Sequence, residues 1–288
     1  MRVLLTGSTG RLGGAFLSLW KNRPDITLRC LGRKDIDLAQ PDEVRDVLEA
    51  SEFDILINPA AVSGLEQCLD HPEEAYAVNA LSPGVMAAVC EEKGCRLVHF
   101  STDYVFGGET STRLDEGAVT HPVNIYGRTK EAGEQAILAA SPSALICRVS
   151  WLFGPGPASH FDSTIERARR GEPMKFITDK FSVPTYTHDI VAWVEALLTN
   201  KTAGIYHLCN AGEPESWHSY SKSICQIAQE LQLLEHPPQI DSLRLADAHF
   251  FRDPRPQHTA MLPQRLISEG IVTPRHWKSA AEDYLKIR

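Results

Sequence analysis

Short apolar runs alternate with longer amphipathic segments through the first half of the chain. The short runs lie between turn residues, which is typical of buried strands. The longer segments carry apolar residues three and four positions apart, which is typical of helices. The expected strands are 2–6, 26–31, 54–57, 96–100 and 144–149, and the expected helices are 12–20, 41–50, 72–92 and 124–140. This alternation predicts an α/β fold with a doubly wound parallel sheet, a Rossmann fold.

The second half of the chain is less regular. It predicts helices at 161–170, 189–198, 217–233 and 277–287, strands at 174–178 and 204–208, and an irregular Pro-rich stretch over 235–264. We expect residues 1–150 to form an NAD(P)-binding domain and residues 151–288 a smaller, interleaved substrate-binding region. The elements at 174–185 and 204–210 are expected to return to the sheet of the first domain.

A glycine turn stands between the first strand and the first helix. Gly7, Gly10 and Gly13 are three residues apart, and the chain enters this turn directly from an apolar strand. Glycines here allow a tight turn, close approach to a pyrophosphate and close packing of helix on strand. The free N–H groups at the helix start then face the phosphates. We therefore predict dinucleotide binding at Gly7, Gly10, Arg11, Leu12 and Gly13.

The second strand is followed by Gly32, Arg33 and Lys34, where many NAD-binding folds have an acidic residue. Two cations and no acid favour a 2′-phosphate, so Arg33 predicts NADP(H) as the cofactor, with NAD(H) as the alternative. The alternative is that these residues form a solvent-exposed basic turn that binds no phosphate. Small residues after the third strand, Ala60 and Ala61, leave room for the cofactor on the strand end.

Tyr126 and Lys130 are four residues apart on an expected helix, so they share one face. A nearby ammonium favours the phenolate, so we expect Lys130 to lower the pKa of Tyr126. Such a phenol is suited to give a proton to a carbonyl that is being reduced. Thr102, at the end of the fourth strand, is placed to hydrogen-bond the same oxygen. A Tyr–Lys pair on a helix surface is the simpler alternative.

Composition narrows the classes of function. The net charge of −8 and the pI near 5.8 argue against nucleic-acid binding. The seven Cys residues are scattered without Cys-x-x-Cys pairs, which suggests reduced thiols in the cytoplasm. The sequence contains no His-x-x-x-His pair, so it does not predict a structural metal site. No apolar run is long enough for a membrane span. The opening strand leaves no room for a signal peptide.

Two of these motifs together resemble a known family. The spacing Gly-x-x-Gly-x-x-Gly over 7–13, with Tyr-x-x-x-Lys, is similar to the short-chain dehydrogenase/reductase superfamily. Ser-Thr-Asp-Tyr-Val-Phe at 101–106, followed by Tyr-Gly-x-Thr-Lys-x-x-Gly-Glu at 126–134, resembles the dTDP-4-dehydrorhamnose reductase family of extended members. The resemblance runs from the first strand to Arg255 and Pro256, and so covers almost the whole chain.

The resemblance implies reduction of a 4-keto group on a nucleotide-activated deoxysugar, with hydride from NAD(P)H and the proton from Tyr126. Lys130 would also hold the nicotinamide ribose. Further cofactor contacts would come from Asp37, Leu38 and Val62, and substrate contacts from Thr102, Asp103, Trp151, Lys180 and Arg255. We expect Lys180 and Arg255 to close over the diphosphate because they bring positive charge to an acidic protein. Some relatives are dimers with magnesium at the contact; a homodimer is therefore one expectation, and no motif here requires the metal.

Departures from the family pattern cluster near the expected sugar pocket, so the substrate is less defined than the chemistry. Lys180 and Ser182 stand where the family often has Gln and Gly. Two alternatives stay open. The regulatory β subunit of methionine adenosyltransferase shares this fold and the Tyr-Gly-x-Thr-Lys segment, and serves as a binding partner. An epimerase or dehydratase with tightly held NAD is the other, although Asp103 is the only acid near Thr102.

Overall fold

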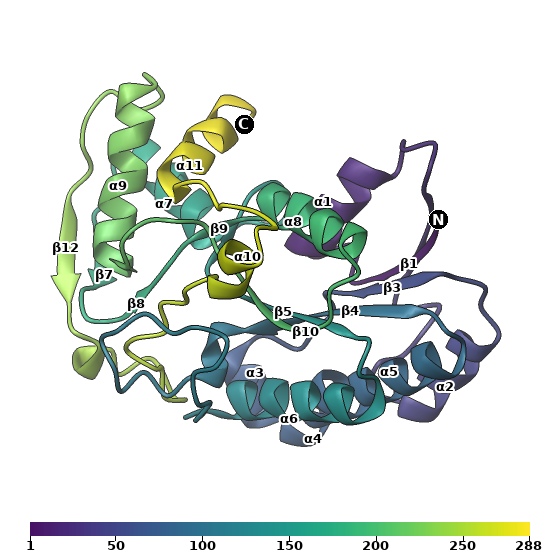
Figure 1. Ribbon diagram of the computed structural model, residues 1–288. Coiled ribbons are helices and arrows are strands. Elements are labelled where there is room, and N and C mark those ends of the chain that lie inside the picture. Colours follow the sequence, from purple (N-terminus) through teal and green to yellow (C-terminus); the bar gives the residue numbers. More distant parts are fainter.

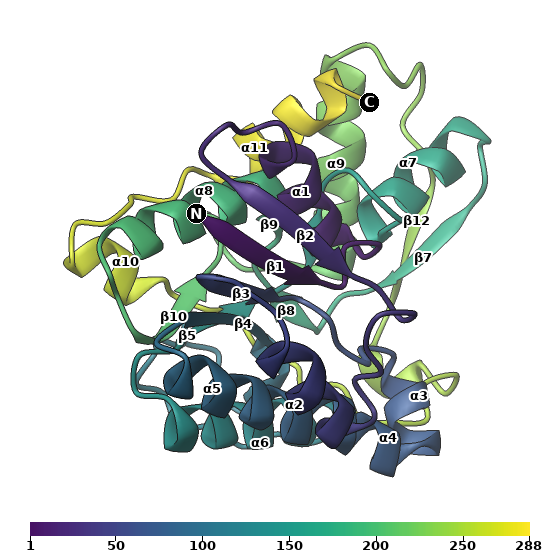
Figure 2. The ribbon, with the colours of Figure 1, turned by 90° about the vertical axis from the view of Figure 1, so that its right-hand side faces the viewer.

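The computed structural model describes residues 1–288 and centres on a six-stranded parallel sheet. The strands lie in the order β2-β1-β3-β4-β5-β10 (Figures 1 and 2). Their bounds are β1 Arg2–Thr6, β2 Thr27–Leu31, β3 Ile55–Asn58, β4 Arg96–Thr102, β5 Leu145–Val149 and β10 Gly204–Leu208. The order reverses on either side of β1, and such switch points are where open α/β sheets bind ligands. The predicted doubly wound α/β fold is confirmed.

Helices cover both faces of this sheet (Figure 1). One face is covered by α1 Arg11–Trp20 and α8 Thr187–Thr199, the other by α2 Pro41–Glu49, α5 Ser82–Glu92 and α6 Ile125–Ala140. Successive side chains of a strand point to opposite faces. Val3 and Leu5 therefore pack beneath α1, whereas Leu4 packs on the side of α2 and α5. Burial on both faces explains why the inner strands β1 and β3 read as nearly unbroken apolar runs, whereas the edge strand β2 alternates exposed and partly buried residues.

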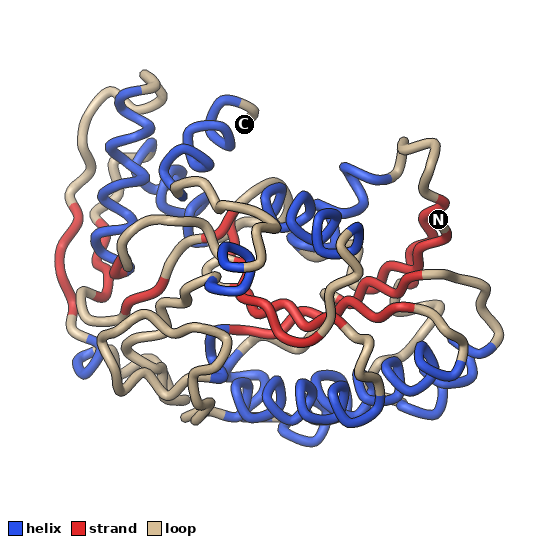
Figure 3. The backbone as a smooth tube through the Cα atoms, in the orientation of Figure 1, coloured by secondary structure: helices blue, strands red, loops and turns tan.

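The C-terminal part forms a second, aromatic-rich core. Its helices are α7 His160–Arg169, α9 Trp217–Glu230 and α11 Trp277–Lys286, beside the two-stranded parallel pair β7 Met174–Ile177 and β12 Ile240–Leu243. Figure 3 shows much of the chain between α9 and α11 as loop. The remaining elements are short: α3 Leu65–Asp70, α4 Pro72–Tyr76, η1 Ala77–Leu81, η2 Asp103–Val105, η3 Leu245–Asp247, α10 Gln264–Ser268, β6 Leu152–Phe153, β8 Phe181–Ser182, β9 Thr185–Tyr186 and β11 Glu215–Ser216. None of the helices has the length and apolar content that a membrane span requires.

Two expectations for the second half need correction. The segment at 174–178 does not return to the central sheet; its strand β7 pairs with β12, inside the stretch expected to be irregular. β12 reads Ile-Asp-Ser-Leu, which is too short and polar to stand out as a strand, yet it satisfies the open edge of β7. The segment at 204–208 does return, because β10 pairs with β5 in register from Gly204 opposite Leu145.

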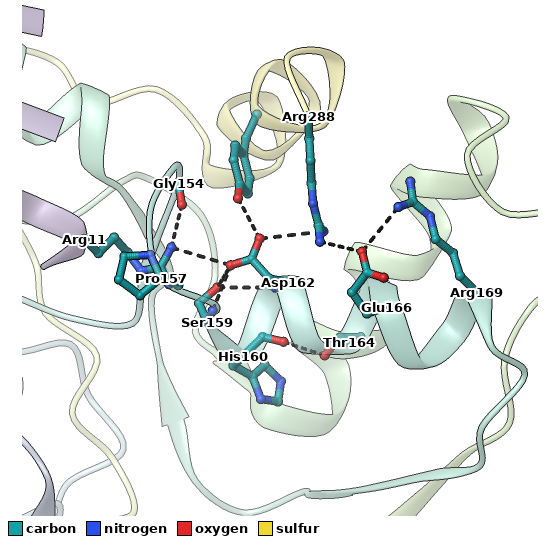
Figure 4. Close-up of polar contacts among 11 residues, drawn as sticks. Arg11, Gly154, Pro157, Ser159, His160, Asp162, Thr164, Glu166, Arg169 and Arg288 are labelled. Carbon is teal, nitrogen blue, oxygen red and sulfur yellow. Dashed lines mark hydrogen bonds and ion pairs between the residues drawn. The ribbon is translucent and has the colours of Figure 1, made fainter. Parts of the chain in front are cut away.

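A buried carboxylate joins the first helix to the second core (Figure 4). Asp162, in the first turn of α7, accepts hydrogen bonds from Ser159 N at 2.8 Å and from Tyr284 Oη at 2.6 Å. Arg11 Nη1 lies 3.5 Å from the same carboxylate and donates to Gly154 O at 2.5 Å. Burial alone would raise the pKa of Asp162, but the hydrogen bonds from Ser159 and Tyr284 lower it below its usual value.

The Asp162→Asn variant should lower the free energy of unfolding at pH 7 by about 2 kcal/mol, the scale of hydrogen bonds to a charged group. The native pKa is lowered, so this stabilisation is fully present above the unfolded pKa of about 3.9 and is lost as pH falls through the native value. Urea titrations at several pH values measure it. Glu166→Gln is the control, because Glu166 is 44% exposed and its pairs with Arg169 and Arg288 should contribute less than about 1 kcal/mol. Equal losses in both variants at every pH would contradict the role of Asp162.

Candidate active site

Two buried polar residues stand where β4 ends and η2 begins, Thr102 and Asp103. The Thr102 hydroxyl caps the η2 turn by accepting from Tyr104 N at 3.2 Å. The Asp103 carboxylate is 2% exposed and accepts from Ser182 Oγ at 3.0 Å and from Thr259 Oγ1. Burial raises the pKa of Asp103, against the opposing charge of Lys180. These two residues thus mark a buried polar point where β4 passes into η2.

Helix α6 brings the Tyr–Lys pair to this point. Asn124 caps the helix by accepting from Gly127 N at 2.8 Å, so Tyr126 falls in the first turn. A Cβ at Gly127 would lie 2.2 Å from Tyr104 O, so glycine allows the helix to pack directly on η2. The rings of Tyr126 and Tyr104 then meet edge to face at 5.8 Å.

Lys130 lies one turn further along α6, and its side chain is buried. Its Nζ donates to Phe100 O at 2.7 Å and lies 3.0 Å from His99 Nε2. Burial lowers the pKa of Lys130 to about 8, with Glu134 acting in the opposite direction. The ammonium is therefore held against the backbone of β4 at a pKa close to neutrality.

The expected lowering of the Tyr126 pKa is not found in this structure. Burial raises the pKa of Tyr126 and the charge of Asp103 raises it further, while the Thr102 hydroxyl acts in the opposite direction. The ammonium of Lys130 is directed at Phe100 O instead of the phenol. Sequence spacing placed both side chains on one face of the helix, but could not show that burial outweighs the charge.

The glycine turn fits a dinucleotide pyrophosphate. Gly7 has φ +57°, and Gly10 N donates to Gly7 O at 3.0 Å, which closes the turn. A Cβ at Gly13 would lie 2.1 Å from Gly7 O, so α1 packs directly on the turn. A Cβ at Gly10 would meet only that oxygen, at 3.3 Å, so this side of the loop is open. The first-turn N–H groups of α1 have no partners within the helix and suit phosphate oxygens.

The predicted cofactor residues differ in whether their side chains already have hydrogen-bond or ion-pair partners within the protein. The Arg11 side chain is committed to Gly154, Pro157 and Asp162, which leaves its backbone N–H for a phosphate. Arg33 is exposed, and its side chain makes no hydrogen bond or ion pair. The carboxylate of Asp37 is turned back to its own loop, where it accepts from Ala39 N at 2.9 Å.

The loop after β3 is held in place by a residue inside the expected helix 72–92. Asn79 accepts from Val62 N at 2.9 Å and donates to Val62 O at 2.8 Å. It lies in η1, a π-helical turn between α4 and α5, and such turns are frequent at functional sites. A Cβ at Gly7 would lie 3.0 Å from Ala60 Cα. The loop Ala60, Ala61 and Val62 is therefore fixed beside the glycine turn. Leu38, another predicted cofactor residue, has its backbone oxygen bound by Ser82 Oγ at 2.8 Å.

Lys180 lies in an aromatic cage. Its Nζ has no hydrogen-bond partner and lies 4.8 Å from the ring centre of Tyr104, 5.7 Å from that of Trp151 and 5.9 Å from that of Trp217. Burial lowers the pKa of Lys180 to about 8, while Asp103 raises it. Trp151 has φ +41°, a strained conformation for a bulky residue, and strain of this kind gathers at functional sites.

Arg255 lies near this cage but is already paired. Its guanidinium is 2.6 Å from a Glu66 carboxylate oxygen and 4.0 Å from the ring centre of Phe251. A diphosphate at Arg255 would have to replace Glu66, whose side chain is 38% exposed.

The contacts thus connect most of the predicted site residues. Tyr126 meets Tyr104, Tyr104 meets Lys180, and Lys180 meets Trp151, all beside Asp103. Sequence reasoning missed four residues that shape the site: Tyr104, Trp217, His99 and Thr259. Tyr104 lies within the motif at 101–106, directly after Thr102 and Asp103, and its position beside these two residues could have predicted it. Trp217 and Thr259 are distant in sequence, so only the fold brings them here.

Comparison with known proteins assigns the family. Residues 1–288 match the family described as RmlD substrate binding domain. The chain belongs to this family. It is 34% identical to a dTDP-4-dehydrorhamnose reductase of Mycolicibacterium smegmatis, over 98% of this chain and 84% of that protein. It is 31% identical to a dTDP-4-keto-6-deoxy-D-glucose reductase of Streptomyces niveus, over 97% and 94%. The crystal structure of a Bacillus anthracis dTDP-4-dehydrorhamnose reductase in complex with NADP superposes with a TM-score of 0.91, at 26% identity, over 100% and 99% of the chains.

The cage around Lys180 generates a test by pH. Folding lowers the pKa of Lys180 from about 10.4 to about 8, so burial of its charge costs folding free energy at neutral pH. Between about pH 8 and about pH 10.4 the folded state holds a neutral amine, and this cost disappears. Over that window, the free energy of unfolding of the parent should rise relative to Lys180→Met by about 2–3 kcal/mol. Denaturant titrations measure the difference. Lys175→Met, an exposed neighbour on β7, should show no such trend. Parallel pH profiles for parent and Lys180→Met would mean that Lys180 keeps an ordinary pKa.

Proposed function

We propose that this protein is an NADPH-dependent reductase of the 4-keto group of a nucleotide-activated deoxysugar. The observation that carries the proposal is the meeting of Thr102, Tyr126 and Lys130 at the carboxyl end of β4, in a sheet whose first strand ends in a glycine turn built for a pyrophosphate. Relatives that match nearly the whole chain are named as reductases of such sugars, and one related structure holds NADP.

In this proposal the bound cofactor supplies hydride to the carbonyl carbon of the sugar. Tyr126 donates its phenolic proton to the carbonyl oxygen as that oxygen gains charge, so ketone, hydride and proton give one alcohol. The raised pKa of Tyr126 keeps the phenol protonated at neutral pH but makes release of the proton more costly, so the site has to stabilise the phenolate. Solvent restores the proton after product leaves.

Two neighbours lower the cost of forming the phenolate. The Thr102 hydroxyl already acts to lower the pKa of Tyr126. In this proposal it also donates a hydrogen bond to the sugar carbonyl oxygen as that oxygen gains negative charge. The Lys130 ammonium adds positive charge one helical turn away and binds the nicotinamide ribose. Because both groups are fixed before substrate arrives, little reorganisation is needed during the reaction.

Asp103, Trp151 and Lys180 form the sugar side of the site. Trp151 offers a ring face, and the buried Lys180 ammonium offers N–H donors that no protein group uses. We assign Lys180 to the sugar or the adjoining phosphate, and Arg255 to the diphosphate in exchange for Glu66. The homodimer and the cytoplasmic location that the sequence suggested stay predictions, which analytical ultracentrifugation and cell fractionation check.

Arg33 is assigned to the 2′-phosphate of NADPH because it is exposed and unpaired, next to a strand end without an acid. Arg33→Ala should weaken NADPH binding about tenfold to a hundredfold, the scale of hydrogen bonds to a charged group, and leave NADH binding unchanged. Fluorescence titration of both cofactors measures the ratio. Arg29→Ala, on β2 of the same sheet edge, is the control. Equal affinities for NADPH and NADH in the parent would refute the assignment.

Tyr126→Phe removes only the hydroxyl, so the fold and NADPH affinity should survive. Its kcat for reduction of a 4-keto sugar nucleotide should fall by about 10²–10⁴, the usual contribution of a positioned proton donor. NADPH consumption measures the rate. Tyr104→Phe, the neighbouring ring at 5.8 Å, is the matched control and should retain most of the activity.

Full turnover by Tyr126→Phe would exclude the phenol as donor. A parent that binds NADPH but reduces no 4-keto sugar nucleotide would instead favour the regulatory-subunit alternative, which a pull-down with a methionine adenosyltransferase tests. Purification with NAD firmly bound would favour an epimerase or dehydratase.

A further inference from the structure

A chain of buried polar side chains connects the glycine turn to Lys130. Thr6, the last residue before Gly7, has its Oγ1 2.6 Å from Asn58 Oδ1. Asn58 Nδ2 lies 3.0 Å from His99 Nδ1, and His99 Nε2 lies 3.0 Å from Lys130 Nζ. All four residues are at most 1% exposed. They come from β1, β3, β4 and α6, so the chain crosses three neighbouring strands, at the last residues of β1 and β3 and at the middle of the longer β4.

Counting donors along this chain links the orientation of Asn58 to the position of the proton on His99. A neutral imidazole has one N–H and one lone pair, and burial with the charge of Lys130 lowers the pKa of His99 well below its usual value. If Lys130 is an ammonium, Nε2 must accept from it, so the proton is on Nδ1 and must meet the Asn58 carbonyl oxygen. If Lys130 is a neutral amine, Nε2 can donate to it, and Nδ1 accepts from the Asn58 amide nitrogen.

The two arrangements differ by one proton and by the orientation of Asn58. An ammonium with Asn58 Nδ2 facing the ring would leave the imidazole without a proton on either nitrogen, or set two N–H groups against each other. The orientation in this structure, with Asn58 Nδ2 facing the ring, belongs to the arrangement with a neutral Lys130. Exchange between the two arrangements moves the imidazole proton from Nδ1 to Nε2 and turns the amide through half a turn. Thr6 tolerates both orientations, since a hydroxyl both donates and accepts.

We infer that His99 and Asn58 form a two-state hydrogen-bond switch that sets the charge of Lys130 and couples it to Thr6 at the base of the cofactor turn. His99 is thus a positioning residue: it acts on the reaction through Lys130. The inference deepens the proposed function, on which its catalytic meaning rests, whereas the switch itself is a property of the protein without substrate.

The electrostatic surroundings single out Lys130 as the group that titrates in this network. From α6, Lys130 faces His99 directly, Glu134 follows one turn later and Tyr126 precedes it by one turn. From β5, Arg148 pairs with Glu134 at 2.6 Å, so that carboxylate is largely balanced. β1 and β3 contribute only the neutral Thr6 and Asn58. With the pKa of Lys130 at about 8, the exchange falls in the physiological range.

The decisive experiment reads the His99 tautomer by long-range ¹H–¹⁵N NMR on the full chain labelled at histidine. The proton should be on Nδ1 at about pH 6.5 and on Nε2 at about pH 9.5, on either side of the Lys130 pKa. His207 is the internal control. Its Nδ1 lies 3.1 Å from Leu114 O and Arg148 Nη1 faces its Nε2, so its proton should stay on Nδ1 at both pH values. A His99 tautomer that does not change between these pH values overturns the inference.

Variants give a second readout through NADPH affinity. His99→Leu leaves the Lys130 ammonium with Phe100 O alone, so the pH at which NADPH binding weakens should fall by about one unit. His99→Gln retains an acceptor and should restore most of the parent profile. Identical profiles for Leu, Gln and parent overturn the coupling to the cofactor site. If the tautomer changes but the protein has no ketoreductase activity, the switch stands and the reductase proposal is refuted. If the protein reduces the ketone but the tautomer stays fixed, the reductase proposal stands and the switch is refuted.

Discussion

A side chain at position 13 would have its first carbon 2.1 Å from Gly7 O, which no real contact allows. This close approach seats α1 on the glycine turn, and the rest of the molecule depends on where α1 starts. The helix start has N–H groups without partners inside the helix, which suit phosphate oxygens. The same first turn carries Arg11, whose guanidinium reaches Gly154, Pro157 and Asp162 in the C-terminal part. One steric constraint thus positions both the free N–H groups of the helix start and the contacts of Arg11 with the C-terminal part.

Two buried lysines, Lys130 and Lys180, are surrounded by different kinds of groups. Lys130 has a carbonyl and an imidazole as partners, so its charge can be held or released by a defined network. Lys180 has three aromatic rings and no hydrogen bond, so its donors are unsatisfied until something polar arrives. The first arrangement suits a group that must keep its position through turnover. The second suits a group that recognises a ligand, since binding removes a cost that the protein otherwise carries.

The sequence predicted the central sheet, the glycine turn and the Tyr126–Lys130 pair because each is encoded within a few consecutive residues. It failed where the partner is remote. β12 was invisible since its four residues form a strand only beside β7, and the cage around Lys180 draws Trp217 from another element. The direction of the Tyr126 pKa was wrong because spacing reports proximity to a charge and says nothing of burial. Arg255 looked free in the sequence and is paired with Glu66, 189 residues away.

The return of β10 to the central sheet has a consequence for how the chain folds as it is made. β5 ends at Val149, and the strand that covers its outer edge begins only at Gly204. Until that strand emerges from the ribosome, the apolar edge Leu-Ile-Cys-Arg-Val presents unpaired backbone groups, the kind of surface on which chains join to one another. Completion of the central sheet therefore waits for residues that come after α7 of the C-terminal part and α8 of the sheet's own face. A pause in synthesis between these two strands would be the interval in which this protein is most exposed to aggregation.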